Sequence, residues 1–275
     1  MKTPRIAFTD IDGTLLDKDR HIAPATRREV DRLSAAGIPF ILISSRMPRA
    51  MTHLQADLDI EGLPLIAYNG GLVVVDGRTV SSQAIDLKVA EVIREFSQSA
   101  PLSVSLYYVD EWYVESMDHY AKREEHNTRT SPTVQNLTTT IANWREAGHG
   151  AHKIMCMGEP GRLDRLITLL ESEFSSQLHL YRSKDDYLEI ADARISKLTG
   201  VRTLLEDAYP YLSLGDCIAF GDNYNDVEML EGVGIGVAVG NARPEAKSVA
   251  DHVVAGNKED GVAEGLAKYC PTPPA

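Results

Sequence analysis

Residues 5–16 read Arg5-Ile6-Ala7-Phe8-Thr9-Asp10-Ile11-Asp12-Gly13-Thr14-Leu15-Leu16, and this stretch decides the fold. Its apolar run, residues 6–8, does not alternate with polar residues, which is typical of a strand covered on both faces. The run stops at two carboxylates and a glycine, whose backbone freedom suits a sharp turn. In open α/β sheets, ligands bind at the carboxyl ends of strands. An ordinary strand-to-turn exit explains Asp-Gly equally well, so this stretch alone leaves both interpretations open.

Three further apolar runs continue the pattern along the chain. They span residues 38–43, 65–68 and 217–220, and helical periodicity is seen over 23–36, 49–58 and 197–207. Strands that alternate with helices predict an α/β fold, a doubly wound and mostly parallel sheet. Apolar segments on either side of Asp76-Gly77 predict a β-hairpin after the third strand.

The pattern changes between the third and fourth of these strands. Residues 83–188 hold most of the aromatic residues and predict antiparallel strands with helices on one face, an α+β arrangement. A polar stretch over 121–136 shows little pattern of its own. We therefore predict a core domain made of residues 1–82 and 189–275, interrupted by an inserted α+β domain at 83–188.

Composition narrows the classes of partner. Forty acidic against 28 basic residues give a formal net charge of -12, which repels nucleic acid and anionic membrane surfaces. The three cysteines, Cys156, Cys217 and Cys270, form no Cys-x-x-Cys pair and indicate neither a disulfide framework nor a zinc site. Without an apolar signal region or a membrane span, the chain is expected to be cytoplasmic. The sequence leaves the oligomeric state open.

Polar clusters follow four of the predicted strands. They are Asp10 with Asp12, Ser44 with Ser45, Asn69 with Gly70, and Asp222 with Asn225 and Asp226. Carboxylates that converge on one sheet edge repel one another unless a cation lies among them. An all-oxygen set with few side-chain ligands suits Mg²⁺, which keeps several waters and takes a phosphate oxygen. Each cluster alone is compatible with a polar loop, and it is their shared placement that indicates a site.

Taken in order, these motifs resemble the haloacid dehalogenase-like phosphatases, most closely the Cof-type members, which carry a large cap domain inserted after the third core strand. Residues 10–14 resemble the first motif of that family, Ser44 the second, Lys197 the third and residues 221–226 the fourth. The resemblance spans the whole core, whereas the inserted domain matches in position more than in sequence. Two residues depart from the family pattern: Ser45 stands where glycine is usual, and Val239 stands where methionine is usual.

The resemblance implies roles for the acidic residues. Asp10 would attack phosphorus and become an aspartyl phosphate. Asp12 would protonate the departing alcohol and later activate water, for which its pKa must be raised. Mg²⁺ would be held by the carboxylates of Asp10 and Asp222 and by the backbone carbonyl of Asp12, with Asp226 supporting these ligands.

The same resemblance implies a set of phosphate-binding groups. They are Ser44, Lys197, Asn225 and the backbone N–H groups around Ile11 and Ser45. We further expect Arg46 and Asn69 to lie at the rim, facing the leaving group. Without the motifs, Lys197 would be interpreted as a surface lysine and Ser44 as a hydroxyl bonded to its own loop.

The sequence therefore predicts a phosphoric monoester hydrolase that depends on Mg²⁺ and acts on small phosphorylated metabolites, with sugar phosphates as the expected class. A phosphomutase on the same scaffold remains open, because nothing in the core motifs excludes it. A non-catalytic sensor of phosphorylated metabolites is a third possibility, against which the complete set of Asp10, Asp12, Lys197 and Asp222 argues.

Overall fold

The computed structural model describes residues 3–271 and divides the chain into two compact units. The first, here called the core, comprises the chain up to Arg46, Met51–Ser81 and the chain from Ser196 onward. The second, here called the cap, comprises Met47–Ala50 and Ser82–Ile195. The predicted division at 82/83 and 188/189 differs from this mainly at its second boundary, because strand β11 (Tyr187–Asp192) continues past residue 188 within the cap sheet. Residues 1–2 and 272–275, which the prediction assigned to the core, lie outside the described residues.

The core is built on one sheet in the order β14-β13-β12-β1-β2-β3-β4-β5. Its strands are β1 (Ile6–Thr9), β2 (Phe40–Ile43), β3 (Leu65–Ala67), β4 (Leu72–Val75), β5 (Arg78–Ser82), β12 (Cys217–Gly221), β13 (Ile235–Ala238) and β14 (His252–Val253). The run from β14 to β3 is parallel, and β4 joins β3 antiparallel. The predicted fold class, a doubly wound and mostly parallel sheet, is confirmed.

Helices cover both faces of this sheet. They are α1 (Pro24–Ala35), α2 (Arg49–Asp57), α7 (Lys197–Ala208), α8 (Val227–Gly232), α9 (Pro244–Val249) and α10 (Gly261–Tyr269). On one face, Val201 and Leu204 of α7 pack with Phe8 and Ile41 of the sheet. Helices α1 and α10 lie side by side, because the Arg32 guanidinium donates to carbonyl oxygens at the end of α10. The central strands β1, β2, β3 and β12 are buried throughout, as their unalternated apolar residues require.

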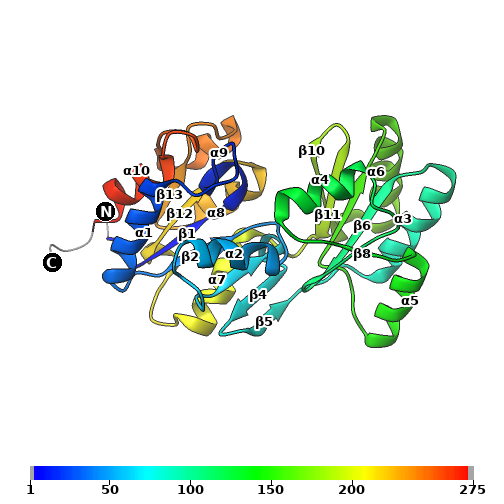
Figure 1. The fold of residues 1–275 in the computed structure, drawn as a ribbon, viewed down its shortest axis with the longest axis horizontal. Helices are drawn as coiled ribbons and strands as arrows, with labels where there is room; N and C mark the ends of the chain where they lie inside the picture. Colours follow the sequence, from blue (N-terminus) through cyan, green and yellow to red (C-terminus); the bar gives the residue numbers. More distant parts are fainter. Residues whose placement is uncertain (1–2, 272–275) are drawn as a thin grey trace. The chain divides into compact units, whose positions relative to one another are not determined.

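The connections reverse direction at β1, which places the carboxyl end of this strand at a ligand-binding position. From β1 the chain passes through α1 to β2 on one side, whereas β12 pairs with β1 on the other (Figure 1). A crevice outside the strand ends forms at such a switch point in open α/β sheets. The short turn η1 (Ile11–Leu15) begins there, directly after Asp10.

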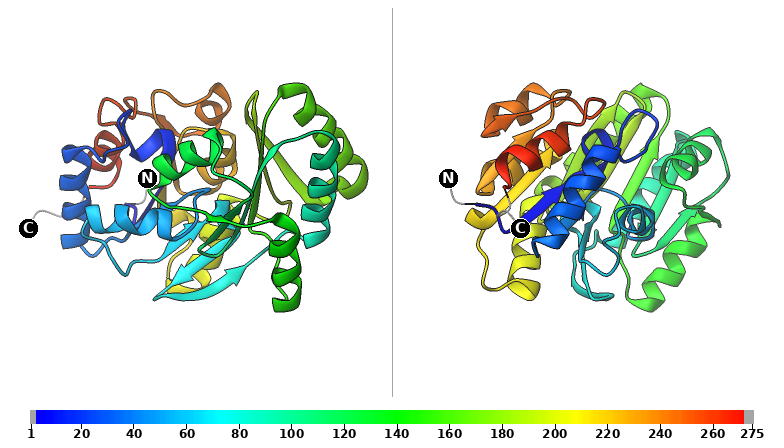
Figure 2. Two further views of the ribbon diagram at one scale, coloured as in Figure 1. Left: turned by 45° about the vertical axis from the view of Figure 1, so that its right-hand side comes forward. Right: turned by 60° about the vertical axis from the view of Figure 1, so that its left-hand side comes forward.

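The cap contains a sheet in the order β10-β11-β9-β6-β7-β8. Besides β11, its strands are β6 (Ser103–Tyr108), β7 (Glu111–Val114), β8 (Thr133–Val134), β9 (Lys153–Met157) and β10 (Leu178–Lys184). Helices α3 (Leu87–Ser99), α5 (Leu137–Ala147) and α6 (Pro160–Phe174) share one hydrophobic core with the sheet residues Val104, Ile154 and Leu188. Figure 2 shows these helices along one face of the sheet.

A fourth cap helix, α4 (His119–Thr128), occupies the stretch that showed little pattern in the sequence. The Asp118 carboxylate accepts hydrogen bonds from the backbone N–H groups of Tyr120 and Ala121 and so caps this helix. Tyr120 contacts Tyr187, whereas the next residue of β11, Leu188, points into the core shared with α3, α5 and α6. Helix α4 therefore lies on the other face of the sheet, and the prediction of helices on one face alone was wrong.

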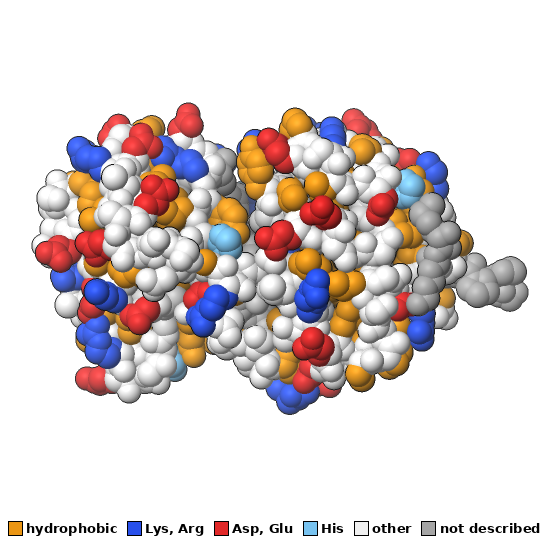
Figure 3. All heavy atoms as spheres, turned by 180° about the vertical axis from the view of Figure 1, so that it is seen from behind, with side chains coloured by type: hydrophobic (Ala, Val, Ile, Leu, Met, Phe, Trp, Pro, Cys, Tyr) orange, Lys and Arg blue, Asp and Glu red, His pale blue; other side chains and the backbone are white. Residues whose placement is uncertain are grey.

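No helix within residues 3–271 has the length and apolarity needed to cross a membrane. On the face drawn in Figure 3, acidic and basic side chains are scattered among uncharged ones and form no large patch of one sign.

Candidate active site

The site begins where β1 ends in Asp10 and the chain turns through η1. Gly13 occupies the turn with φ of +94°, a conformation that glycine adopts without the steric cost of a side chain. A Cβ at this position would lie 2.5 Å from Oδ2 of Asp222. Gly13 thus serves two purposes: it allows the turn, and it leaves room for a carboxylate that comes from β12.

Asp222 follows β12, the neighbour of β1 in the sheet, so parallel pairing brings it to the same edge as Asp10. The Thr14 hydroxyl donates to Oδ1 of Asp222 at 2.9 Å and fixes the carboxylate beside the turn. The two residues are 208 positions apart in sequence. Long-range strand pairing, rather than local structure, assembles this part of the site.

A buried lysine joins the acidic residues. Lys197 is 0% exposed, and its Nζ donates to Oδ1 of Asp10 at 2.5 Å and to Oδ1 of Asp226 at 2.6 Å. Lys197 is the first residue of α7, which begins in a capping box between Ser196 and Thr199. The structure therefore does not support the interpretation of Lys197 as a surface lysine.

Asp226 uses both carboxylate oxygens within the protein. Oδ1 pairs with Lys197, and Oδ2 accepts hydrogen bonds from the backbone N–H groups of Asp222 and Asn223, each at 2.9 Å. Gly221 makes this approach possible, because a Cβ there would lie 2.5 Å from the Asp226 side chain. Asp226 thus holds the loop that carries Asp222, which is the placement that a supporting role requires.

Three carboxylates and one ammonium lie close together in this cluster, and their charges act on one another. Burial raises the pKa of Asp10 well above its ordinary value; Lys197 opposes this rise, and the nearby charges of Asp226 and Asp222 add to it. Burial together with the charge of Asp226 raises the pKa of Asp222 to about 6. Burial alone would lower the pKa of Lys197, but Asp10 and Asp226 outweigh it and raise that pKa. One ammonium does not neutralise three carboxylates that are largely removed from water. A bound cation would neutralise the remaining negative charge.

The donor chemistry of the cluster fits a hard divalent cation. One carboxylate oxygen from each of Asp10, Asp222 and Asp226 lies within 4.8 Å of the others. Within residues 3–271, Lys197 engages Oδ1 of Asp10 and Thr14 engages Oδ1 of Asp222, so the Oδ2 atoms of both carboxylates are available to a ligand. Because Asp226 is committed to Lys197 and the loop, Asp10 and Asp222 are the side chains that fit Mg²⁺.

Asp12 differs from the expectation. Its side chain is held by two arginines: Arg46 donates from Nε to Oδ2 at 2.7 Å and from Nη2 to Oδ1 at 2.8 Å, and Arg20 donates from Nη2 to Oδ1 at 2.6 Å. Partial loss of surrounding water would raise the pKa of Asp12, but the hydrogen bonds and charges of Arg46 and Arg20 outweigh this effect and lower that pKa. The required rise in pKa is therefore absent in this state of the protein, because the arginines stabilise the carboxylate.

The remaining predicted residues lie next to these groups. Ser44 is buried at the end of β2, and its Oγ accepts a hydrogen bond from the backbone N–H of Arg46 at 3.2 Å, which is the local loop contact considered for it. Arg46 and Asn69 are buried, and the Asn69 Oδ1 accepts from Nδ2 of Asn225 at 2.9 Å. Ile11 is buried at the start of η1, and Ser45 separates Ser44 from Arg46.

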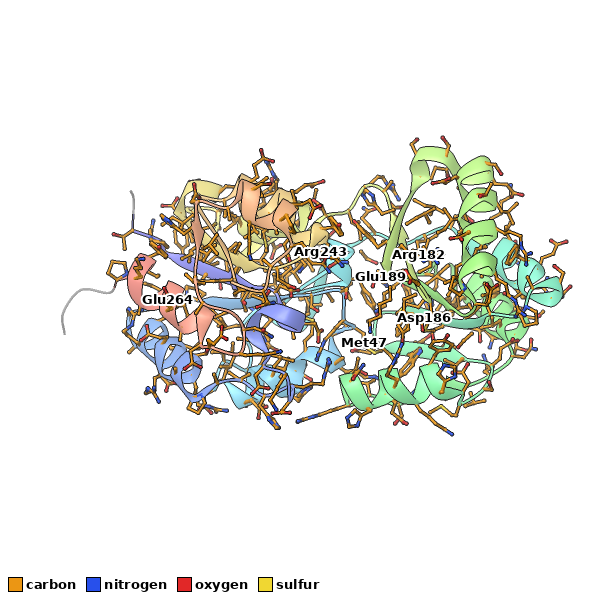
Figure 4. The ribbon with its side chains drawn as sticks, turned by 90° about the horizontal axis from the view of Figure 1, so that it is seen from above. Met47, Arg182, Asp186, Glu189, Arg243 and Glu264 are labelled. Atoms are coloured by element: carbon orange, nitrogen blue, oxygen red, sulfur yellow. The ribbon has the colours of Figure 1, made fainter. Side chains whose placement is uncertain are left out.

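Some contacts at the site had no predicted role. Asn241 donates from Nδ2 to the carbonyl of Gly13 at 2.8 Å. Arg243, labelled in Figure 4, donates from Nε to Asn223 and lies over the Tyr224 ring beside the loop of Asp222. No sequence pattern indicated a role at the site for Arg20, which lies in a polar turn.

Comparison with known proteins agrees with this geometry. A family model described as haloacid dehalogenase-like hydrolase matches residues 7–266. A Haemophilus influenzae protein named "Putative phosphatase" is 32% identical over 97% of this chain and 98% of its own. An HMP-PP phosphatase of Yersinia pseudotuberculosis is 26% identical over 98% of this chain and 96% of its own.

Among solved structures, a haloacid dehalogenase-like hydrolase from Bacteroides thetaiotaomicron is 27% identical, with a TM-score of 0.87 over 96% of this chain and 99% of that one. The predicted resemblance to the Cof-type phosphatases and the predicted enzyme class, a phosphoric monoester hydrolase, are confirmed by these matches. With its motifs assembled at one edge of a doubly wound sheet and matched over nearly its full length, the chain belongs to the haloacid dehalogenase-like hydrolase family.

Proposed function

We propose that the protein is a Mg²⁺-dependent phosphatase that hydrolyses small phosphorylated metabolites through an aspartyl phosphate on Asp10. The observation that carries the proposal is the position of Asp10: it is buried at the end of β1, paired with Lys197 and close to the Asp222 carboxylate. Such a carboxylate can attack phosphorus in line while neighbouring groups bind the phosphoryl oxygens. Sugar phosphates stay the expected substrate class, and the cytoplasmic location stays a prediction.

In this mechanism, Lys197 changes its partner. Its ammonium lies between Asp10 and Asp226, so a phosphoryl group that reaches Asp10 also reaches Lys197. Lys197 and the Ser44 hydroxyl then stabilise the charge that spreads over the phosphoryl oxygens in the transition state. Asp226 keeps the ammonium in place throughout, because it is anchored to the backbone of the same loop.

Asp12 supplies the proton for the leaving alcohol and then takes one from the attacking water. To do so, it must give up part of its contact with the arginines, since both of its oxygens are occupied by them. The carboxylates of Asp10 and Asp222 and the backbone carbonyl of Asp12 would hold Mg²⁺. When bound, this ion supplies positive charge that polarises a phosphoryl oxygen.

The proposal is tested with p-nitrophenyl phosphate, assayed with Mg²⁺ and with EDTA. The variant Asp10→Asn should lose at least about a thousandfold in kcat, because it removes the nucleophile, and EDTA should abolish turnover. Asp31→Asn, an exposed carboxylate on α1, is the matched control and should retain activity. Turnover that survived either Asp10→Asn or EDTA would contradict the mechanism.

The same assay separates this function from a phosphomutase. A phosphatase releases inorganic phosphate in step with loss of the ester, whereas a mutase returns the phosphoryl group to a sugar. Isomerisation of a sugar phosphate that depends on a bisphosphate, with negligible phosphate release, would favour the mutase.

A further inference from the structure

Arg20 lies in a short loop that is built to hold its position. The loop is closed by a bridge between Leu16 and Ile22, and the Asp17 carboxylate accepts hydrogen bonds from the backbone N–H groups of Asp19 and His21. The backbone N–H of Arg20 donates to the carbonyl of Asp17, and Arg20 itself has φ of +64°. The hydrogen bonds within the loop and the left-handed conformation of Arg20 thus direct its guanidinium group toward Asp12.

The two arginines on Asp12 differ in kind. The Arg46 side chain is 4% exposed and donates hydrogen bonds to both carboxylate oxygens of Asp12. Its backbone N–H donates to the Ser44 hydroxyl oxygen. Arg20 is 33% exposed, and its Nη2 donates to an oxygen of Asp12 that Arg46 also contacts. Arg46 is therefore the arginine that stays bound to Asp12, and Arg20 is the arginine that can exchange its contact with Asp12 for one with an incoming group.

Two guanidinium groups meet on the Asp12 carboxylate, and Arg20 is the more exposed of the two. The Asp12 side chain is 42% exposed, so a ligand can reach this pair of guanidinium groups. In the proposed mechanism, the Asp12 carboxyl contacts the oxygen of the leaving group, so Arg20 faces the part of the substrate beyond the transferred phosphoryl group.

We propose that Arg20 binds a second anionic group, a phosphate or a carboxylate, carried by the leaving-group portion of the substrate. This inference rests on the proposed function, and it names the substrate class: phosphorylated metabolites with an additional negative charge are preferred over otherwise identical neutral ones. A guanidinium presents paired N–H donors that match an oxyacid group. Its transfer from Asp12 to the substrate also removes one of the two donors on Oδ1 of Asp12, while Arg46 remains in place.

Two substrate pairs test the proposal: glycerol 3-phosphate against 3-phosphoglycerate, and fructose 6-phosphate against fructose 1,6-bisphosphate. The wild type should show a higher kcat/KM for the charged member of at least one pair. Arg20→Gln should reduce that preference by roughly tenfold to a hundredfold, the worth of one charge-assisted contact, and Arg20→Lys should restore part of it. The two pairs separate a carboxylate from a phosphate as the recognised group.

Lys18→Gln is the matched control, because Lys18 lies in the same loop, is 67% exposed and pairs with Asp19. It should leave the preference unchanged. Equal losses for both members of each pair in Arg20→Gln would overturn the proposal and assign Arg20 to positioning of Asp12 alone. A wild type without any preference for the charged members would overturn it as well.

A binding measurement makes the proposal independent of turnover. The same four compounds are titrated into Asp10→Asn and into the double variant Asp10→Asn/Arg20→Gln. Tighter binding of the charged members to the single variant, lost in the double variant, supports the proposal even if the wild type hydrolyses none of them. The proposed function stands or falls on the p-nitrophenyl phosphate assay, whereas equal discrimination by both variants in this titration would refute the anion site.

Discussion

Gly13 is the residue at which backbone conformation and site geometry depend on each other most directly. Its φ of +94° disfavours any side chain, and a Cβ at this position would lie only 2.5 Å from Oδ2 of Asp222. We expect Gly13→Ala to displace Asp222 or the turn and to lower kcat/KM by about a hundredfold, the scale of an ångström-sized misplacement. The measurement is the assay with p-nitrophenyl phosphate at saturating Mg²⁺.

Gly37 provides the control for this substitution. It also has a positive φ, of +70°, but nothing lies within 4 Å of its Cβ position. Gly37→Ala should therefore lose about 1 kcal/mol of stability from backbone strain and keep its activity. Similar activity losses in both variants would show that strain, rather than crowding at Asp222, limits the enzyme.

At the residue scale, the sequence was most informative where motifs carry fixed spacing. Asp10, Lys197, Asp222 and Asp226 lie together, because parallel pairing of β1 with β12 and the start of α7 bring them to one edge. The ionisation of Asp12 was not predictable, since it is decided by Arg20 in a polar turn and by Arg46 after another strand. Such partners follow from side-chain direction rather than from sequence pattern.

At the scale of elements, His152 connects three parts of the cap. It is 1% exposed just before β9; its Nδ1 accepts from the backbone N–H of Val109, between β6 and β7, and its Nε2 lies 2.9 Å from the Ser82 hydroxyl at the end of β5. Its ring stacks on Tyr108. Burial lowers the pKa of His152 to about 4, with the nearby His149 adding to the effect. The folded cap therefore holds this ring neutral.

We expect this histidine to make the cap less stable in acid. In the unfolded chain its pKa is near 6.5, so between about pH 6.5 and pH 4 the unfolded state binds a proton that the folded state does not. The free energy of unfolding should fall as the pH falls through this window, by up to about 3 kcal/mol from this group. Urea unfolding at several pH values measures the slope. His152→Gln should flatten it, and the exposed His126→Gln should not; equal slopes in all three proteins would contradict the assignment.

The elements themselves were predictable to differing degrees. Strands of the core sheet stand out because burial on both faces makes them uniformly apolar, as in residues 40–43 and 217–220. Helix α4 escaped prediction because its sequence is mostly polar, with only Ala121 and Thr128 buried, so helical periodicity is faint. The local signal for this helix was Asp118, whose side chain accepts a hydrogen bond at the helix N-terminus.

At the scale of the whole molecule, metal binding should couple to folding. Asp10 and Asp222 come from strands far apart in the chain, so an unfolded chain has no preformed site and the proposed ion would favour the folded core. We expect saturating Mg²⁺, at a hundred times its dissociation constant, to stabilise the protein by about 2.7 kcal/mol, measured by thermal unfolding without substrate.

Asp222→Asn should abolish most of this stabilisation, whereas Asp59→Asn, an exposed site in the core, should retain it. Equal stabilisation of both variants would place the ion elsewhere. The two-unit organisation was apparent from the change of pattern in the sequence, but the end of the cap was not, because β11 continues past residue 188 without any break in composition.

The 208 positions between Thr14 and Asp222 also bear on how the protein is made. During translation, β1 leaves the ribosome long before its neighbour β12 exists, while the nearly contiguous cap can fold as soon as it emerges. The first strand synthesised therefore pairs on one side with a strand that is synthesised about 200 residues later. A stalled chain that ends before Cys217 would carry the cap and Asp10, yet it would lack both Asp222 and the strand that pairs with β1 on that side.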